Sequence, residues 1–169
     1  MRRVTLLIAA LAICAIPLSA AASSAESVGL GVALGVAFPE GADLKTEVVV
    51  DDWDPSFNWG FYVNIPLIST FHITPSAELY QIGEQNATDI SIAFKFIVPI
   101  WLLDIYVGVV PGLTTIADIH AMNVGGLVGL SFNMIANLDF FVQAKYKIMF
   151  HGDHNVRTLH GHAGVLFTF

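Results

Sequence analysis

The C-terminal segment of the chain alternates between two kinds of side chain. One set is apolar or small and consists of Leu159, Gly161, Ala163, Val165, Phe167 and Phe169. The other set is mostly polar or small and consists of His160, His162, Gly164, Leu166 and Thr168. Successive side chains of a strand point to opposite faces, so a period of two residues predicts a strand. We expect its two faces to meet different surroundings.

The same pattern recurs along the chain and gives eight predicted strands. They cover residues 28–38, 59–68, 71–82, 90–98, 102–112, 122–134, 138–150 and 159–169. These lengths suit tilted strands of about 9–11 residues that cross a bilayer, and closed transmembrane barrels begin at about eight strands. The sequence therefore predicts an all-β fold, an eight-stranded antiparallel up-and-down transmembrane β-barrel.

Composition favours a bilayer around the outer face. Hydrophobic residues make up 55% of the chain and the mean hydropathy is +0.68, which is high for a soluble domain of 169 residues. The apolar stretch at residues 90–113 contains Lys95, Pro99, Asp104 and Pro111, which a membrane-spanning helix would place in hydrocarbon. As strands, the stretch turns Lys95 inward. A polytopic helical protein is the alternative interpretation.

The end of the chain also resembles the C-terminal signal by which Gram-negative outer-membrane barrels are recognised for insertion. The residues that carry this resemblance are His162, Gly164, Phe167 and Phe169. The predicted architecture resembles the small barrels typified by the OmpA membrane domain and OmpX. The resemblance implies a monomer in the bacterial outer membrane, with outer-membrane lipid and lipopolysaccharide as partners and the barrel-assembly machinery engaged during insertion. It implies no particular activity, because unrelated families share this topology.

The N-terminus has the order of a secretory signal. Two arginines precede an apolar run at residues 4–18, and small residues follow it up to Ala25. The run is shorter than the roughly 20 residues of a spanning helix, so an uncleaved anchor is the weaker interpretation. Cleavage after Ala22 or Ala25 fits; we predict a signal peptide at residues 1–25 and the barrel domain at residues 26–169.

The predicted connections alternate in length. The first, residues 39–58, is long; the second, fourth and sixth are short, at residues 69–70, 99–101 and 135–137; the third, fifth and seventh are intermediate, at residues 83–89, 113–121 and 151–158. Outer-membrane barrels keep short turns in the periplasm, so the odd-numbered connections are expected outside the cell. The first is acidic, and the net charge of the chain is -7. This charge argues against nucleic acid as a partner.

Five charged residues are expected in the lumen, namely Glu78, Lys95, Asp104, Lys145 and Lys147. The heights of the first three suggest a network of Glu78, Lys95 and Asp104. Eight strands enclose a space that side chains fill, so we predict a plugged lumen.

Four histidines cluster in sequence around the last hairpin, namely His151, His154, His160 and His162, and His120 lies in the preceding predicted loop. Imidazole is a common metal ligand, but the spacing matches no defined site. We therefore predict polar lumen and loop residues, with no metal and no cofactor.

The residues do not assemble a catalytic triad. Ser76, Ser91 and Ser131 are predicted to face the lumen, away from the lipid that a deacylase would need to reach. We predict a non-enzymatic outer-membrane barrel with a structural, envelope-integrity or surface-interaction role. A lipid A-modifying enzyme and a narrow channel or transport protein are the alternatives.

Overall fold

The structure is a computed structural model that describes residues 27–40, 55–117, 119–135, 137–151 and 154–169. Its eight strands are β1 (Gly29–Glu40), β2 (Ser56–Ile68), β3 (Phe71–Ile82), β4 (Gln85–Ile100), β5 (Leu103–Ile116), β6 (Ile119–Ile135), β7 (Leu138–His151) and β8 (His154–Thr168). The predicted signal peptide and most of the acidic first connection lie outside the described residues.

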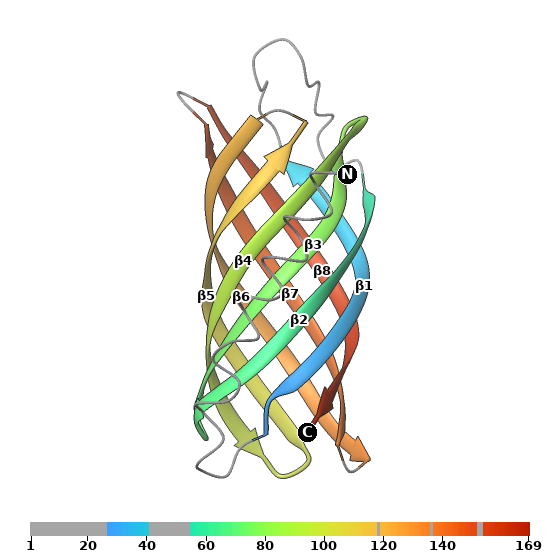
Figure 1. The fold of residues 1–169 in the computed structure, drawn as a ribbon, viewed down its shortest axis with the longest axis vertical. Helices are drawn as coiled ribbons and strands as arrows, with labels where there is room; N and C mark the ends of the chain where they lie inside the picture. Colours follow the sequence, from blue (N-terminus) through green and yellow to red (C-terminus); the bar gives the residue numbers. More distant parts are fainter. Residues whose placement is uncertain (1–26, 41–54, 118, 136, 152–153) are drawn as a thin grey trace.

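The strands form one closed barrel in which each pairs antiparallel with its neighbours in sequence (Figure 1). The β1–β8 pair closes the sheet, with a register that runs from Gly29 opposite Thr168 to Glu40 opposite Arg157. The predicted fold class is confirmed. In the described part of the chain, no helix has the length and hydropathy needed to cross a membrane.

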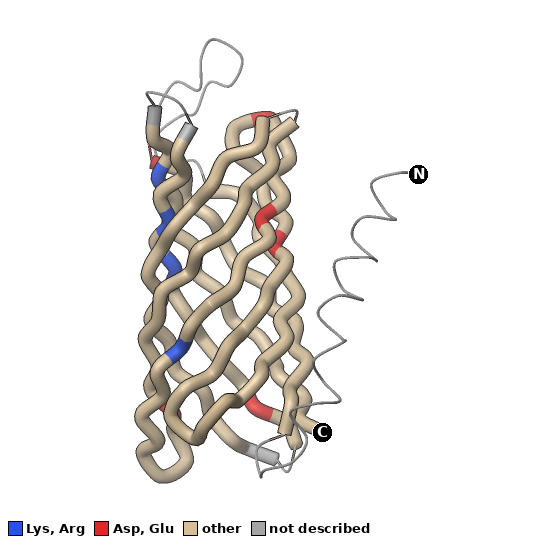
Figure 2. Tube along the Cα trace, turned by 60° about the vertical axis from the view of Figure 1, so that its left-hand side comes forward, with Lys and Arg blue, Asp and Glu red and all other residues tan. Residues whose placement is uncertain are grey.

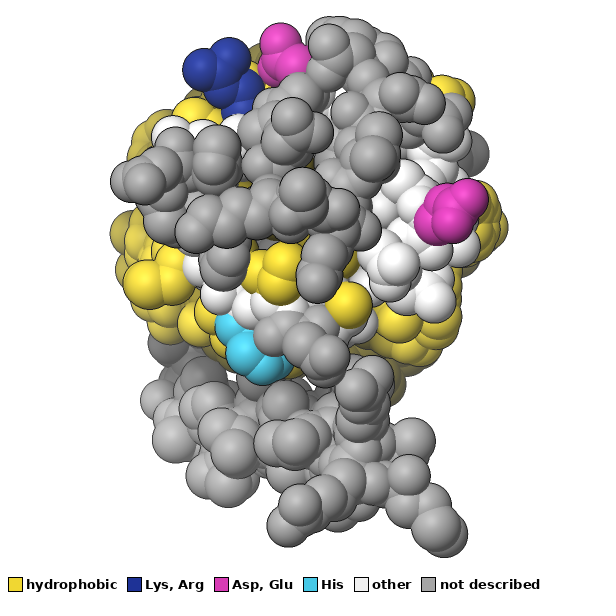
Figure 3. Space-filling model, turned by 90° about the horizontal axis from the view of Figure 1, so that it is seen from above, with side chains coloured by type: hydrophobic (Ala, Val, Ile, Leu, Met, Phe, Trp, Pro, Cys, Tyr) yellow, Lys and Arg dark blue, Asp and Glu magenta, His cyan; other side chains and the backbone are white. Residues whose placement is uncertain are grey.

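The two predicted faces of the strands are also confirmed. On β7, Val142 and Tyr146 are exposed on the outer wall, whereas Gln143, Lys145 and Lys147 are buried in the lumen. Seen from above, hydrophobic side chains lie along the visible left and right edges of the barrel (Figure 3). A soluble barrel would place its charged side chains outside, so this arrangement is the one that suits a hydrocarbon environment.

The end of the barrel that holds the C-terminus, called the lower end here, has the short turns that the sequence predicted (Figure 1). Ser69–Thr70 joins β2 to β3, Trp101–Leu102 joins β4 to β5, and residues 136–137 join β6 to β7. Trp101 and Asn137 adopt positive φ angles of 58° and 71°. These conformations let the β4–β5 and β6–β7 turns reverse the chain within two residues.

At the opposite, upper end, the predicted intermediate loops are wrong. β3 and β4 are separated only by residues 83–84, β5 and β6 by residues 117–118, and β7 and β8 by residues 152–153. The polar residues that suggested loops instead continue the alternation of the strands, because a polar side chain that faces the lumen leaves the backbone free to pair. The first connection remains the long one at this end.

Buried side chains occupy the lumen at several levels. An apolar cluster lies towards the upper end and consists of Ala37, Tyr80, Ile82, Ala87, Ile116, Ala121, Met149 and Val156. Two smaller clusters lie towards the lower end; one is Ala93, Ile97, Tyr106, Val110 and Leu127, and the other is Ala33, Tyr62 and Phe141 with Leu166 packed against it. The polar residues described next lie between them.

Candidate functional site in the barrel lumen

The middle of the lumen holds a group of buried polar and charged side chains, here called the lumen cluster: Asn58, Glu78, Asp89, Lys145, Lys147, His160 and His162. β3 supplies Glu78 and β4 supplies Asp89 directly opposite it in register. β7 supplies the two lysines, two residues apart and therefore on one face. Because β7 lies four strands from β3, acidic and basic residues lie on opposite walls of the barrel (Figure 2).

Two ion pairs cross the lumen. The Lys145 ammonium contacts Glu78 Oε1, and Lys147 Nζ lies 2.6 Å from Asp89 Oδ1. Lys147 Nζ is also 3.8 Å from Glu78 Oε2. All four side chains are at most 1% exposed. Two carboxylates and two ammonium groups balance in charge, as buried ions require.

Neutral residues donate the remaining hydrogen bonds to Asp89. Its Oδ2 accepts hydrogen bonds from Thr114 Oγ1 at 2.7 Å and from Asn123 Nδ2 at 2.6 Å. The carboxylate therefore has donors on both oxygens. Such a fully bonded group fixes the distance between β4 and the strands that face it across the lumen.

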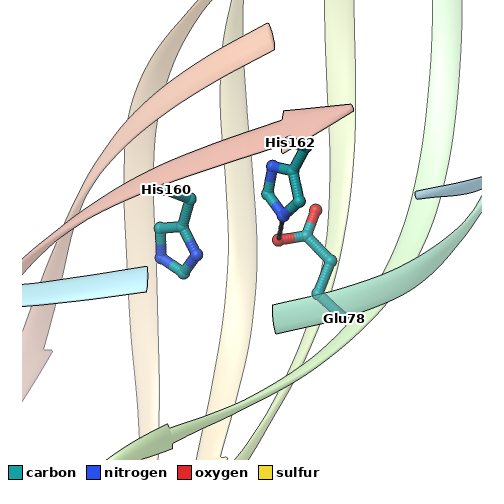
Figure 4. A group of neighbouring side chains, drawn as sticks. All are labelled: Glu78, His160 and His162. Carbon is teal, nitrogen blue, oxygen red and sulfur yellow. Dashed lines mark ion pairs between the residues drawn. The ribbon is translucent and has the colours of Figure 1, made fainter. Parts of the chain in front are cut away.

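The two histidines of β8 line the other side of the cluster. Asn58 Nδ2 lies 2.8 Å from His160 Nδ1 and 2.7 Å from His162 Nε2, so one amide bridges both rings. His160 Nε2 contacts Thr158 Oγ1 at 2.8 Å. His162 Nε2 is 3.7 Å from Glu78 Oε2, which links the histidines to the ion pairs (Figure 4).

Aromatic residues cover the cluster towards the lower end. Tyr62 donates a hydrogen bond of 3.1 Å to Glu78 Oε1, and the Lys145 ammonium lies 4.9 Å from the centre of the Tyr62 ring. Tyr62 and Phe141 pack edge to face, 5.6 Å between ring centres. This layer separates the ion pairs from the space below.

Lys95 and Asp104 lie in that lower space, apart from the ion pairs. Both line a cavity of about 80 Å³, and the Lys95 ammonium lies 4.8 Å from the centre of the Tyr106 ring. The sequence hypothesis joined Glu78 to Lys95 and Asp104, but the ion-pair partners of Glu78 are Lys145 and Lys147. The five charged residues thus divide between two levels of the lumen.

Sequence reasoning missed Asp89 and Asn58, because both fell in predicted loops. The signal that could have found them is their position in the alternation. Asp89 precedes Ser91 and Lys95 by even steps, and all three face the lumen. Asn58 stands in the same relation to Tyr62.

The other predicted residues have separate places. His120 is exposed and contacts Thr115 Oγ1 at 3.0 Å, whereas the side chains of His151 and His154 lie outside the description. Of the proposed insertion signal, Phe167 and Phe169 are exposed on the outer wall, and their rings pack edge to face. His162 is buried in the lumen, and Gly164 faces the same way, beside Phe141. Recognition of this segment during insertion remains a prediction.

No protein-family model and no curated protein matches the sequence. Solved structures do share the fold. Neisserial surface protein A is 14% identical, with a TM-score of 0.69 over 84% of this chain and 97% of that one. The outer membrane protein OprG from Pseudomonas aeruginosa is 8% identical, with a TM-score of 0.53 over 85% and 97%. The chain therefore has the fold of small outer-membrane β-barrels.

Proposed function

We propose that the protein is a resident of the bacterial outer membrane whose barrel is plugged and whose role is structural or interactive. The observation that carries this proposal is the pair of buried ion pairs across the lumen, Lys145 with Glu78 and Lys147 with Asp89. Water and ions would have to displace these bonds to pass. The apolar cluster above, which contains Ile82 and Met149, adds a second obstacle.

The outer wall supports a bilayer as the surroundings. Large apolar side chains such as Leu34, Val109 and Val128 are exposed on it, at 61%, 58% and 52%. Aromatic residues mark its lower rim, where Trp101 is 95% exposed. Aromatic rings favour the boundary between hydrocarbon and headgroups, so this rim fits the periplasmic interface. Outer-membrane lipid, with lipopolysaccharide in the outer leaflet, is then the main partner of a monomeric barrel.

Contact with other molecules outside the cell is assigned to the first connection. The three remaining upper turns are two residues long and offer little surface. In sequence, residues 40–54 carry six acidic residues and one lysine. A surface of this charge favours cationic partners and disfavours nucleic acid.

A lipid-modifying enzyme receives less support. Ser76 and Ser91 are buried in the lumen, where their hydroxyl groups contact each other at 3.1 Å. His72, the histidine nearest to Ser76 along β3, contacts Asn64. A nucleophile for lipid A would need to reach the outer wall, so these residues suit packing and not acyl transfer.

The test combines location and conductance. Outer-membrane fractions are run on gels with and without boiling, and the purified barrel is then added to planar lipid bilayers. We expect a mobility shift on boiling and no steady unitary conductance. A variant with Lys145→Ala and Lys147→Ala, checked for folding by the same shift, is expected to conduct more than the parent. Steady conductance of the parent would refute the plugged lumen. A parent that shows no mobility shift on boiling would refute the barrel.

A further inference from the structure

Three side chains of the lumen cluster form a set that the ion pairs do not fully use. Glu78 of β3 and His160 and His162 of β8 each offer one ligand atom, and these atoms lie within 4.8 Å of one another (Figure 4). The two imidazole rings are nearly parallel, with centres 5.9 Å apart. All three side chains are at most 2% exposed.

Two polar atoms in this set, and one in the neighbouring Asn58, lack a hydrogen-bond partner. Glu78 Oε2, His162 Nδ1 and Asn58 Oδ1 are buried and have no hydrogen-bond partner among the residues that the structure describes. A buried polar atom that lacks a hydrogen bond destabilises the folded state. Glu78 Oε2 points towards His162 Nε2, 3.7 Å away, and so into the space between the three side chains. A ligand that accepts lone pairs from oxygen and nitrogen together would satisfy it.

We propose that Glu78, His160 and His162 form a binding site for a divalent transition metal ion in the middle of the lumen. Two imidazoles and one carboxylate are the protein ligands of many zinc sites that keep a fourth position open. Asn58 supplies the fourth ligand, because half a turn of its amide brings the unpaired Oδ1 to face both histidines in place of Nδ2.

The geometry needs only a small closure. Metal–ligand bonds of about 2.0–2.1 Å place the atoms of a tetrahedral shell about 3.3 Å apart. The separation of 3.7 Å between His162 Nε2 and Glu78 Oε2 is close to this value. All three ligand atoms lie within 4.8 Å of one another, so the proposal requires rotation of the side chains to close the remaining separations.

The lysines beside Glu78 compete with a metal ion for its carboxylate. Lys145 contacts Glu78 Oε1, and Lys147 lies 3.8 Å from Oε2, so the carboxylate is already neutralised without metal. A divalent ion must share Glu78 with Lys145 and be repelled by its charge. The proposal therefore makes a specific prediction: removing the Lys145 charge strengthens metal binding, although Lys145 contributes no ligand.

Zinc alone is the probe. It is added at a series of free concentrations while the barrel refolds, because the site is buried, and the zinc bound per barrel is then measured. We expect one zinc per barrel in the parent, at least tenfold weaker binding in His160→Gln and in His162→Gln, and at least tenfold tighter binding in Lys145→Met. His120→Gln, which changes an exposed histidine, is the matched control and should bind as the parent does.

Gel mobility without boiling shows which variants fold. If a histidine variant does not fold, cobalt replaces zinc in the parent, and the intense visible absorption of four-coordinate cobalt is the expected result. The proposal is overturned if the parent binds no zinc, if the folded histidine variants bind as tightly as the parent, or if cobalt shows only the weak spectrum of the hydrated ion. Weaker binding in Lys145→Met would refute the competition.

Discussion

The ion pair between Asp89 and Lys147 gives the sharpest test of how the lumen is stabilised. Lys147 Nζ and Asp89 Oδ1 are 2.6 Å apart, and both side chains are fully buried. At an effective dielectric constant of about 20, unit charges at this separation attract by about 6 kcal/mol. The desolvation of both ions offsets much of this attraction, so the net value of the pair is small. Removal of one partner costs much more, because it leaves the other charge buried without its counter-charge.

Asp89→Asn keeps the shape of the side chain but removes its charge. Lys147 then depends on Glu78, whose Oε2 lies 3.8 Å away and whose Oε1 already contacts Lys145. The Asn123 and Thr114 hydrogen bonds also lose a charged acceptor. We expect the free energy of unfolding to fall by about 3–5 kcal/mol, the usual loss when one partner of a buried pair is removed.

The double variant Asp89→Asn, Lys147→Met separates charge from packing. It leaves Glu78 with Lys145 and restores charge balance, so we expect it to recover more than half of the loss, because an apolar replacement avoids the desolvation of two ions. The assay is urea unfolding of protein refolded into phosphatidylcholine vesicles, followed by tryptophan fluorescence and extrapolated to zero denaturant. Asp139→Asn, at the half-buried lower rim, is the control. A loss below about 1 kcal/mol for Asp89→Asn, or a double variant no more stable than the single one, would refute this account.

Two further predictions use the same unfolding assay. Val128→Lys places a charge on the outer wall of β6, where Val128 is 52% exposed, and should cost about 2–4 kcal/mol, as a lysine in mid-bilayer does; Val128→Thr is the control, and equal losses in the two would show that this wall does not face hydrocarbon. Ala117→Gly should stabilise the protein by about 0.5–1 kcal/mol, because Ala117 has a φ of 50° and pays about 1–2 kcal/mol for a left-handed conformation that glycine adopts freely. A lower stability of the glycine variant would contradict that turn conformation.

The sequence predicted the fold and the two faces of each strand because alternation is a local property. Whether Lys145 faces the lumen depends only on the parity of its position relative to neighbours such as Gln143 and Tyr146. A charge on the lipid face is costly and a large side chain in a narrow lumen is crowded. The sequence of each strand therefore indicates which of its side chains face the lumen and which face lipid. The short lower turns were predicted for the same reason, since they interrupt the alternation within two or three residues.

The partners of each lumen residue were not predicted because they depend on register. A loop at residues 83–89 would have placed Glu78 near Lys95 on the neighbouring strand. The turn is instead at residues 83–84, so Glu78 lies opposite Asp89, and Lys95 lies opposite His72. The error at this one turn shifted the predicted neighbour of Glu78 by six residues, from Asp89 to Lys95. It also left Asp89 out of the predicted set of lumen charges.

The partners of lumen residues were also not predicted because contacts across the lumen join strands that are not neighbours. Lys145 and Glu78 are 67 residues apart in sequence, and Asn58 and His162 are 104 apart. Their heights match only after seven registers and the closure of β1 on β8 have fixed the tilt of every strand. Asp89 opposite Glu78 gives this level two negative charges, and the two lysines of β7 are what make their burial possible. The histidines, which need no counter-charge when neutral, leave Glu78 Oε2 without a hydrogen bond. The two ion pairs are thus balanced in charge, yet Glu78 Oε2 is left without a hydrogen bond. Because Lys145 contacts the other oxygen of the same carboxylate, it is expected to control the affinity of the lumen cluster for a metal ion.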